Sequence, residues 1–364
     1  MALSIGIVGL PNVGKSTLFN ALNGGGAEAA NYPFCTIDPN VGIVPVPDAR
    51  MDALAAIVQP QAMQHAIIEF VDIAGLVEGA ASGEGLGNKF LANIRECSAI
   101  AHVVRCFDDE NVTHVSGKVD PLSDIEIIDT ELMLKDMETV QKAVMRTEKQ
   151  CKSGNKDAMA IMAVQKKVLS GLEDGTTLRR QQLSADELNV INELCLLTIK
   201  PVLYVTNVDD SALPDGNAYV ETVREFAKQE GAGVVVVSAQ IESELAEMDS
   251  ESQIEFLSDL GISEPGLNTV IREAYSLLDL ISYFTAGVKE VRAWTIHRGD
   301  TAPKAAAVIH NDFEKGFIRA ETIAYEDFVT LGGEAKAKEG GKMRLEGKEY
   351  IVKDGDVMHF RFNV

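Results

Sequence analysis

A glycine-rich loop near the start constrains this chain more than any other feature. Residues 9–17 read Gly-Leu-Pro-Asn-Val-Gly-Lys-Ser-Thr and match the pattern G-x-x-x-x-G-K-[ST]. The loop follows an apolar run, residues 5–8, that is typical of a strand, and it precedes a helical run. In this strand-loop-helix context, backbone N–H groups wrap phosphate oxygens. The sequence therefore predicts an α/β domain that binds a nucleotide.

The residue types in the loop suit a triphosphate bound with Mg²⁺. Lys15 is expected to bring positive charge to the β- and γ-phosphates, and the Ser16 hydroxyl is expected to bind the metal. The helix that follows directs its positive N-terminal end toward the anion. The residues expected to hold the phosphates are Asn12, Val13, Gly14, Lys15, Ser16 and Thr17.

Two later segments predict a switch-type hydrolase site. Residues 67–73 form an expected strand that leads into D-x-x-G, with Asp72 and Gly75 at its ends. Asp72 can support Mg²⁺ through water, and the Gly75 N–H can meet the γ-phosphate. Lys15, Asp72 and Gly75 are therefore the candidate catalytic residues. Thr36, between the loop and the second strand, is the second candidate Mg²⁺ ligand.

The base is expected to bind near the ends of two later strands. Asn207, Val208 and Asp210 follow the strand at 201–207, and Ser238 ends the strand at 233–239. A guanine site usually reads N-K-x-D with S-A. Here Val208 replaces the lysine, whereas Asp210 keeps the carboxylate that would pair with guanine. Both ATP and GTP therefore remain open on these residues.

The chain is expected to contain six strands of a largely parallel sheet, an inserted helical hairpin and a small β-rich domain at the C-terminal end. The expected sheet strands are 5–10, 41–46, 67–73, 100–107, 201–207 and 233–239. Apolar residues spaced by three and four on both sides of Gly154 predict an antiparallel hairpin at about 130–182. A last helix is expected at 267–280. Further strands are expected at 288–296, 317–324, 348–352 and 357–362. The predicted domains are 1–277 and 278–364.

Charge and cysteine content narrow the class of protein. The chain has 33 basic and 55 acidic residues, a formal charge of −22, which argues against a general DNA-binding role. Residues 135–182, by contrast, carry ten basic and six acidic side chains, so a polyanion would more readily meet this insert or the neutral C-terminal part. No apolar run reaches the ~18 residues of a membrane helix. The five cysteines contain no Cys-x-x-Cys pair, which favours the cytoplasm.

Together these motifs resemble the YchF-type Obg-like ATPases. The resemblance spans essentially the whole chain and rests on the phosphate loop, residues 31–36, 72–77 and 83–88, and the closing segment 354–360. It implies a Ras-like nucleotide domain with an inserted hairpin and a C-terminal TGS domain of β-grasp type. It also implies slow hydrolysis of ATP in preference to GTP, and ribosome binding, with the large subunit expected through rRNA or ribosomal protein. A role in translation or in a stress response is implied as well.

The chain departs from that family at Asp210, where the family pattern has glutamate. Leu76 also stands where Ras-like enzymes place a glutamine that orients water, so weak intrinsic turnover is expected. Asn12 could coordinate K⁺ beside the phosphates or could simply order the loop. Two other readings remain: a GTPase translation factor that reads guanine through Asp210, and a ribosome-binding scaffold whose hydrolysis is incidental.

Overall fold

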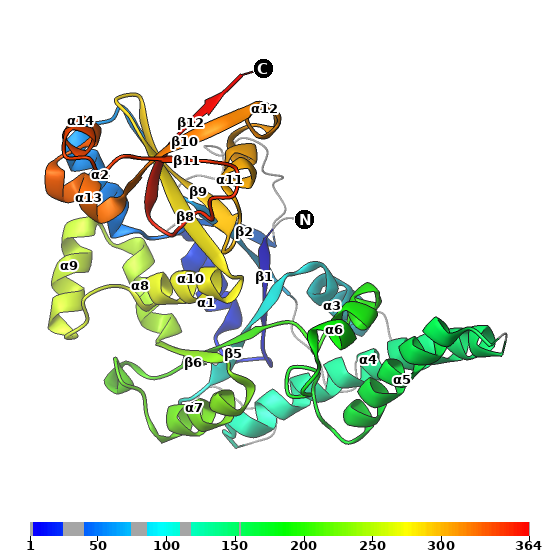
Figure 1. The fold of residues 1–364 in the computed structure, drawn as a ribbon. Helices are drawn as coiled ribbons and strands as arrows, with labels where there is room; N and C mark the ends of the chain where they lie inside the picture. Colours follow the sequence, from blue (N-terminus) through cyan, green and yellow to red (C-terminus); the bar gives the residue numbers. More distant parts are fainter. Residues whose placement is uncertain (1–2, 25–39, 74–85, 110–117, 153, 364) are drawn as a thin grey trace. The chain divides into compact units, whose positions relative to one another are not determined.

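The computed structural model describes residues 3–24, 40–73, 86–109, 118–152 and 154–363 (Figure 1). The chain separates into two compact units. The first comprises residues 1–42 and 69–270, and the second comprises residues 43–68 and 271–364. Within the described residues, no helix combines the length and the apolar character needed to cross a membrane.

The first sheet has the strand order β2-β4-β1-β5-β6-β7. Its strands are β1 (Ser4–Val8), β2 (Val41–Pro45), β4 (Ile67–Asp72), β5 (Ala99–Arg105), β6 (Val202–Asn207) and β7 (Gly233–Val237). Every residue of β1, β5 and β6 is buried, as in a parallel sheet that is covered on both faces. β1 pairs in parallel with β4 and β5. All six predicted sheet strands are confirmed, with ends shifted by at most two residues.

Helices cover this sheet and extend from it. They are α1 (Lys15–Gly24), α3 (Leu86–Glu96), α4 (Pro121–Cys151), α5 (Lys156–Glu173), α6 (Ala185–Ile191), α7 (Ala218–Glu230), α8 (Ala239–Glu247), α9 (Ser250–Asp259) and α10 (Gly266–Leu277), with single 3₁₀ turns at Asn192–Leu194 and Asp210–Ala212. α10 crosses from the first unit into the second. It ends three residues earlier than predicted, and Asp279 then adopts a positive φ of 54° ahead of a new strand.

The predicted hairpin is confirmed in α4 and α5, which project as a long antiparallel pair (Figure 1). Val140, Val168 and Leu172 form the buried seam between them. The hairpin begins earlier than predicted, because Asp120 caps α4 through the Ser123 N–H and Pro121 occupies the first turn. Asn155 starts α5 by accepting hydrogen bonds from two backbone N–H groups.

The second sheet has the order β11-β10-β12-β8-β9-β3. Its strands are β3 (Ala62–Gln64), β8 (Leu280–Ala286), β9 (Glu290–His297), β10 (Phe317–Ala324), β11 (Arg344–Glu346) and β12 (Asp356–Phe362). The accompanying helices are α2 (Ala49–Val58), α11 (Ala302–Ile309), α12 (Asn311–Lys315), α13 (Tyr325–Leu331) and α14 (Glu334–Glu339). The expected strands at 317–324 and 357–362 are confirmed, whereas β8, β11 and the four C-terminal helices were not predicted.

One predicted strand is wrong. Residues 348–352 form no strand, and Ile351 makes only an isolated bridge to Thr301. Ile351 is also 48% exposed, so this run lacks the buried face that holds a strand in a sheet.

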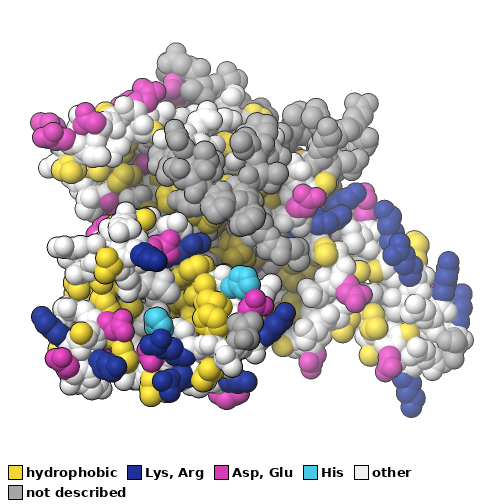
Figure 2. Space-filling model, turned by 90° about the horizontal axis from the view of Figure 1, so that it is seen from above, with side chains coloured by type: hydrophobic (Ala, Val, Ile, Leu, Met, Phe, Trp, Pro, Cys, Tyr) yellow, Lys and Arg dark blue, Asp and Glu magenta, His cyan; other side chains and the backbone are white. Residues whose placement is uncertain are grey.

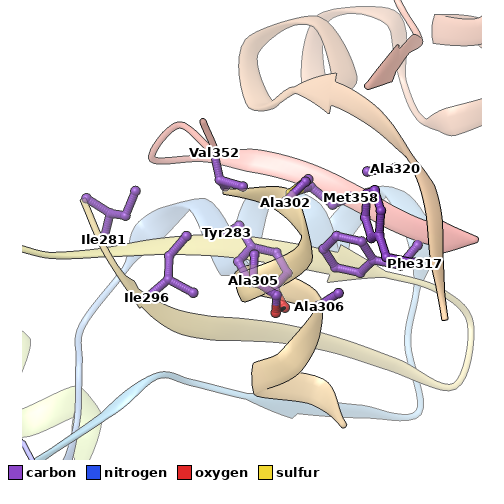
Figure 3. Packing of buried hydrophobic residues seen from close by; sticks show 11 residues of the cluster. Ile281, Tyr283, Ile296, Ala302, Ala305, Ala306, Phe317, Ala320, Val352 and Met358 are labelled. Carbon is purple, nitrogen blue, oxygen red and sulfur yellow. Dashed lines mark hydrogen bonds between the residues drawn. The ribbon is translucent and has the colours of Figure 1, made fainter. Parts of the chain in front are cut away.

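One side of the second sheet packs on α11 around a dense apolar cluster (Figure 3). Tyr283 is completely buried there, and its hydroxyl donates to the Ala305 carbonyl at 2.9 Å. Small residues on α11, Ala302, Ala305 and Ala306, let the helix approach the strands closely. This cluster gives the second unit a core of its own.

The two compact units divide the chain differently from the predicted boundary at 277/278. Residues 43–68, which include α2 and β3, group with the C-terminal part of the chain. β3 pairs in parallel with β9 from Ala62↔Glu290 to Gln64↔Arg292. A three-residue strand whose partner lies so far along the chain leaves no local signal in the sequence. The assignment of 1–277 to a nucleotide domain and 278–364 to a TGS domain stays a prediction.

Candidate nucleotide-binding site

The phosphate loop connects the buried end of β1 to the first turn of α1. Two of its residues have positive φ: Asn12 at 64° and Gly14 at 94°. Asparagine tolerates this left-handed region better than most residues, so the Asn12 conformation suits a loop-ordering role. A Cβ at Gly14 would collide with the side-chain nitrogen of Asn207, and a Cβ at Gly9 would lie 2.8 Å from the Val103 oxygen. The glycines are therefore required by close packing around the loop.

Lys15, the first residue of α1, contacts Asp72, the last residue of β4. β1 and β4 are parallel and adjacent, with Ile7 opposite Asp72, so their carboxyl ends lie at the same sheet edge. Lys15 Nζ forms an ion pair with Asp72 Oδ1 there, and both side chains are largely buried. Ser16 and Thr17 are exposed on the first turn of α1 beside this pair.

These residues provide a suitable set of ligands for Mg²⁺. The Ser16 hydroxyl is a hard oxygen donor of the kind that Mg²⁺ prefers, and the Asp72 carboxylate can hold the metal through a bound water, which leaves the other ligands to Thr36, phosphate and water. Two residues predicted for the site, Thr36 and Gly75, lie outside the described residues, as does Leu76. The structure therefore says nothing about their placement.

Asn207 links the phosphate loop to the segment that is predicted to read the base. Its Nδ2 donates to the Val13 carbonyl at 2.9 Å, and its Oδ1 accepts from the Ala239 N–H at 2.8 Å. Asn207 lies at the end of β6 and is 5% exposed. One side chain thus holds together the predicted phosphate-binding and base-binding elements.

The predicted base-reading residues gather around one cavity of about 370 Å³, which is lined by Asn207, Val208, Asp210 and Ser238 among others. The Ser238 hydroxyl donates to Asp210 Oδ1 at 2.7 Å and also caps α8 through the Ile241 N–H. Val208 is only 3% exposed, and its backbone N–H donates to the Val237 carbonyl. Its side chain is therefore mainly packed in the protein core.

Phe107 and Gln240 also line this cavity, and neither was predicted from the sequence as a site residue. Arg105, at the end of β5, lies 4.5 Å from the Phe107 ring centroid and donates from Nε to the Phe107 carbonyl at 3.1 Å. This guanidinium is almost wholly buried, so the Phe107 ring rests on a fixed cation. The signal available in the sequence was the aromatic residue at the end of the expected strand 100–107.

Acidic side chains crowd the rim of the cavity. Burial raises the pKa of the Asp209 carboxyl, and the neighbouring charges of Asp210, Asp108 and Asp109 raise it further. Like charges placed this close disfavour the ionised form of one another. A bound ligand that brings positive charge or hydrogen-bond donors would relieve this repulsion.

Comparison with known families and proteins gives matches along the chain. Residues 4–134 match a family described as "50S ribosome-binding GTPase". Residues 280–363 match the YchF-GTPase_C family, described as "Protein of unknown function (DUF933)". Curated relatives with the name "Ribosome-binding ATPase YchF" are 61% identical in Haemophilus influenzae, 60% in Escherichia coli O157:H7 and 57% in Bacillus subtilis. Each match covers 100% of both chains.

A solved structure also matches almost the whole chain. The YchF GTPase of Schizosaccharomyces pombe is 39% identical, with a TM-score of 0.89, and the match covers 99% of this chain and 97% of that one. A GTP-binding protein from Pyrococcus horikoshii, at 20% identity and a TM-score of 0.63, shares the fold. The names of these relatives disagree about the nucleotide. The curated relatives are called ATPases, whereas the protein from Schizosaccharomyces pombe is called a GTPase.

Proposed function

The chain belongs to the YchF family, and from that premise we propose that it is a ribosome-binding ATPase that hydrolyses ATP slowly, with Mg²⁺, as a regulatory switch in translation or a stress response. The observation that carries the proposal is the ion pair between Lys15, at the start of α1, and Asp72, at the end of β4. It lies at the edge of the sheet where the parallel strands β1 and β4 both end. Full-length relatives named as ribosome-binding ATPases, at 57–61% identity, support it. The proposed place of action is the cytoplasm.

The proposed roles follow from the positions of the groups. Lys15 leaves Asp72 and pairs with the β- and γ-phosphates, while the backbone of residues 12–17 binds the phosphate oxygens. Ser16 and Thr36 would hold Mg²⁺, which supplies positive charge against the phosphates. Asp72 would support the metal through water, and the Gly75 N–H would meet the γ-phosphate. Asn12 is the proposed ligand of a K⁺ ion.

We propose adenine as the base, bound between the Phe107 ring and the segment that contains Asn207, Val208 and Asp210. Val208 packs into the core, so it cannot cover the base as the lysine of a guanine site does. The Ser238 hydroxyl donates to Asp210 Oδ1 and so orients this carboxylate. The GTPase alternative rests on Asp210 itself, because an aspartate at this place suits guanine.

The proposed docking surface for the ribosome is the outer part of the α4–α5 hairpin. Residues 139–172 carry two acidic side chains, Glu148 and Asp157, against seven basic ones, all exposed: Lys142, Arg146, Lys149, Lys152, Lys156, Lys166 and Lys167. Figure 2 shows basic side chains gathered along the projecting hairpin. This local charge of +5, in a chain of −22, suits the phosphates of rRNA. We propose that the partner is the large subunit.

Cosedimentation with purified ribosomes, in ATP, ADP or no nucleotide, tests the proposal. Wild-type binding is expected to depend on the nucleotide, and Lys15→Ala should remove this dependence together with ATP hydrolysis. If ribosome binding is independent of nucleotide in both the wild type and Lys15→Ala, the scaffold alternative is supported. Arg146→Glu should weaken ribosome binding at least threefold and reduce its salt dependence. Lys228→Glu, an equal charge change on exposed α7, is the matched control and should bind normally.

A further inference from the structure

Arg105 and Asn207 lie side by side at the ends of two buried parallel strands. Arg105 is the last residue of β5 and is in register with Asn207, the last residue of β6. The Cys106 N–H donates to the Asn207 carbonyl at 2.8 Å, so strand pairing continues one residue beyond β5. The segment 106–109 therefore begins directly beside the side chain that holds the phosphate loop.

Hydrogen bonds fix this segment at several points. The Arg105 side chain, in a residue that is 1% exposed, donates from Nε to the Phe107 carbonyl at 3.1 Å and from Nη2 to the Asp109 carbonyl at 3.4 Å. Asn217, which caps α7, donates to the Cys106 carbonyl at 2.7 Å. Hydrogen bonds from a charged donor are among the stronger ones, and a buried guanidinium cannot replace them with water. The Phe107 backbone is therefore held in one place.

The guanidinium also covers one face of the Phe107 ring. Its central carbon lies over the ring, 4.5 Å from the centroid. Phe107 lines the cavity of about 370 Å³ at the base-reading segment, whereas Arg105 does not. The ring therefore stands between the guanidinium and the cavity, and only its opposite face is open to a ligand. A planar cation that stacks on an aromatic ring restricts how the ring can tilt.

The cavity has a particular need for such a ring. In a guanine site the stem of the N-K-x-D lysine covers the plane of the base. Val208 takes that position here and is packed in the core, at 3% exposed. Among the described residues that line the cavity, Phe107 is the only aromatic one. Nucleic-acid bases of every kind stack on aromatic side chains, so the open face of this ring suits a base.

Arg105 also supplies charge to the acidic rim of the cavity. Burial and neighbouring carboxylates raise the pKa of Asp209, and the positive charge of Arg105 lowers it. Loss of this charge would make the surroundings of the bound phosphates more negative. The charge of Arg105 and its contact with the ring must therefore be separated in any experiment.

We propose that Arg105 is a positioning residue for the base: it holds the Phe107 ring as the surface on which the base stacks. The pair formed by Arg105 and Phe107 thus takes the part that the lysine stem has in a guanine site. This inference rests on the proposed function, because it concerns the same adenine site. It assigns a part in nucleotide binding to a buried side chain that does not itself contact the ligand.

Calorimetric titration of the full-length protein with ATP and with inorganic triphosphate, both with Mg²⁺, tests the inference. The dissociation constant of triphosphate divided by that of ATP measures what the base contributes, and effects on phosphate binding cancel in this ratio. Arg105→Lys keeps the charge but loses the planar group, and should lower the ratio about fivefold. Phe107→Leu should lower it about tenfold. In both variants the KM for ATP should rise while kcat stays unchanged.

The double variant shows whether Arg105 acts through the ring. When Phe107 is already leucine, Arg105→Lys should cause no further fall in the ratio. Independent effects would instead multiply to a fall of about fiftyfold, which would overturn the inference. Arg180→Lys is the matched control, because the Arg180 guanidinium lies 5.7 Å from the centroid of the Phe226 ring and neither residue lines the cavity. It should leave the ratio unchanged.

Binding of triphosphate reports whether each variant is folded. If Arg105→Lys does not bind it, Arg105→Gln replaces that variant, and the same base-specific loss is expected because the ratio does not depend on charge near the phosphates. A wild-type ratio near one would mean that the base is not bound, and the proposed adenine site would fail. A wild type that prefers ATP to triphosphate, with a ratio that the Arg105 variants leave intact, would reject this inference alone.

Discussion

The hydroxyl of Ser238 donates a hydrogen bond of 2.7 Å to the carboxylate of Asp210, 28 positions earlier in the chain. Ser238 also accepts from the Ile241 N–H and so begins α8. The carboxylate that is proposed to face the base is therefore oriented by the first turn of a helix. A hydrogen bond to a charged acceptor is among the stronger ones in proteins.

The packing of Val208 in the core, at the position where a guanine site has a lysine, predicts the nucleotide preference. In competition titrations with labelled ATP and GTP analogues, we expect ATP to bind about tenfold more tightly, a difference of ~1.4 kcal/mol. Asp210→Glu should keep the preference for ATP, since the family pattern has glutamate at this position. If instead the wild type prefers GTP and Asp210→Glu loses GTP affinity, Asp210 reads guanine and the GTPase alternative is correct.

Asn207 should be important for stability as well as for binding. Asn207→Ala leaves the Val13 carbonyl and the Ala239 N–H without their side-chain partner in a buried place. Each lost partner costs about 1–3 kcal/mol. We therefore expect the free energy of unfolding without nucleotide to fall by about 3 kcal/mol, measured by urea denaturation. Asn20→Ala, at an exposed position of α1, is the control and should not destabilise the protein.

Glu242 should make stability depend on pH. Burial raises the pKa of its carboxyl from 4.5 to about 7, although the Gly266 N–H donates to it at 2.7 Å. Between these pH values the folded chain binds a proton that the unfolded chain has released. Stability therefore falls as pH rises from 4.5 to 7. The shift corresponds to a loss of about 3 kcal/mol.

Glu242→Gln isolates this contribution. Urea unfolding should find the variant more stable than the wild type at pH 7.5 and similar to it at pH 5. Glu244→Gln, an exposed neighbour on α8, should leave the pH profile unchanged. A wild-type profile identical to that of Glu242→Gln would show that the buried carboxyl does not retain its proton.

Asn12 predicts an effect of monovalent cations. If its side chain holds K⁺ beside the phosphates, ATP hydrolysis should be faster in K⁺ than in Na⁺ at equal ionic strength, because the ion supplies charge that stabilises the transition state. Asn12→Gly retains the left-handed backbone but lacks the ligand, and should abolish the difference. Equal wild-type rates in the two cations would leave Asn12 only its loop-ordering role.

Local sequence patterns were enough to predict most of the secondary structure of the first unit. Each of the patterns used there extends over only a few residues. They are the glycines and Lys15 of the phosphate loop, the apolar runs of β1, β5 and β6, and the seam around Val140 and Val168. Such patterns predict secondary structure reliably because burial repeats with the period of the strand or helix. The second unit was predicted less well: β8 follows α10 after a break of two residues, and the alanine-rich α11 has no strong polar face.

The sequence by itself determined that this chain has a phosphate loop, a D-x-x-G segment and a candidate base-reading segment at 207–210, because each is a contiguous motif with its chemistry in its own residues. Only the tertiary structure decided that Asn207 holds the phosphate loop, that Ser238 orients Asp210, and that α2 and β3 join the C-terminal sheet. These relationships connect residues far apart in the chain, and they form only when parallel strands end at a common edge or a distant segment completes a core.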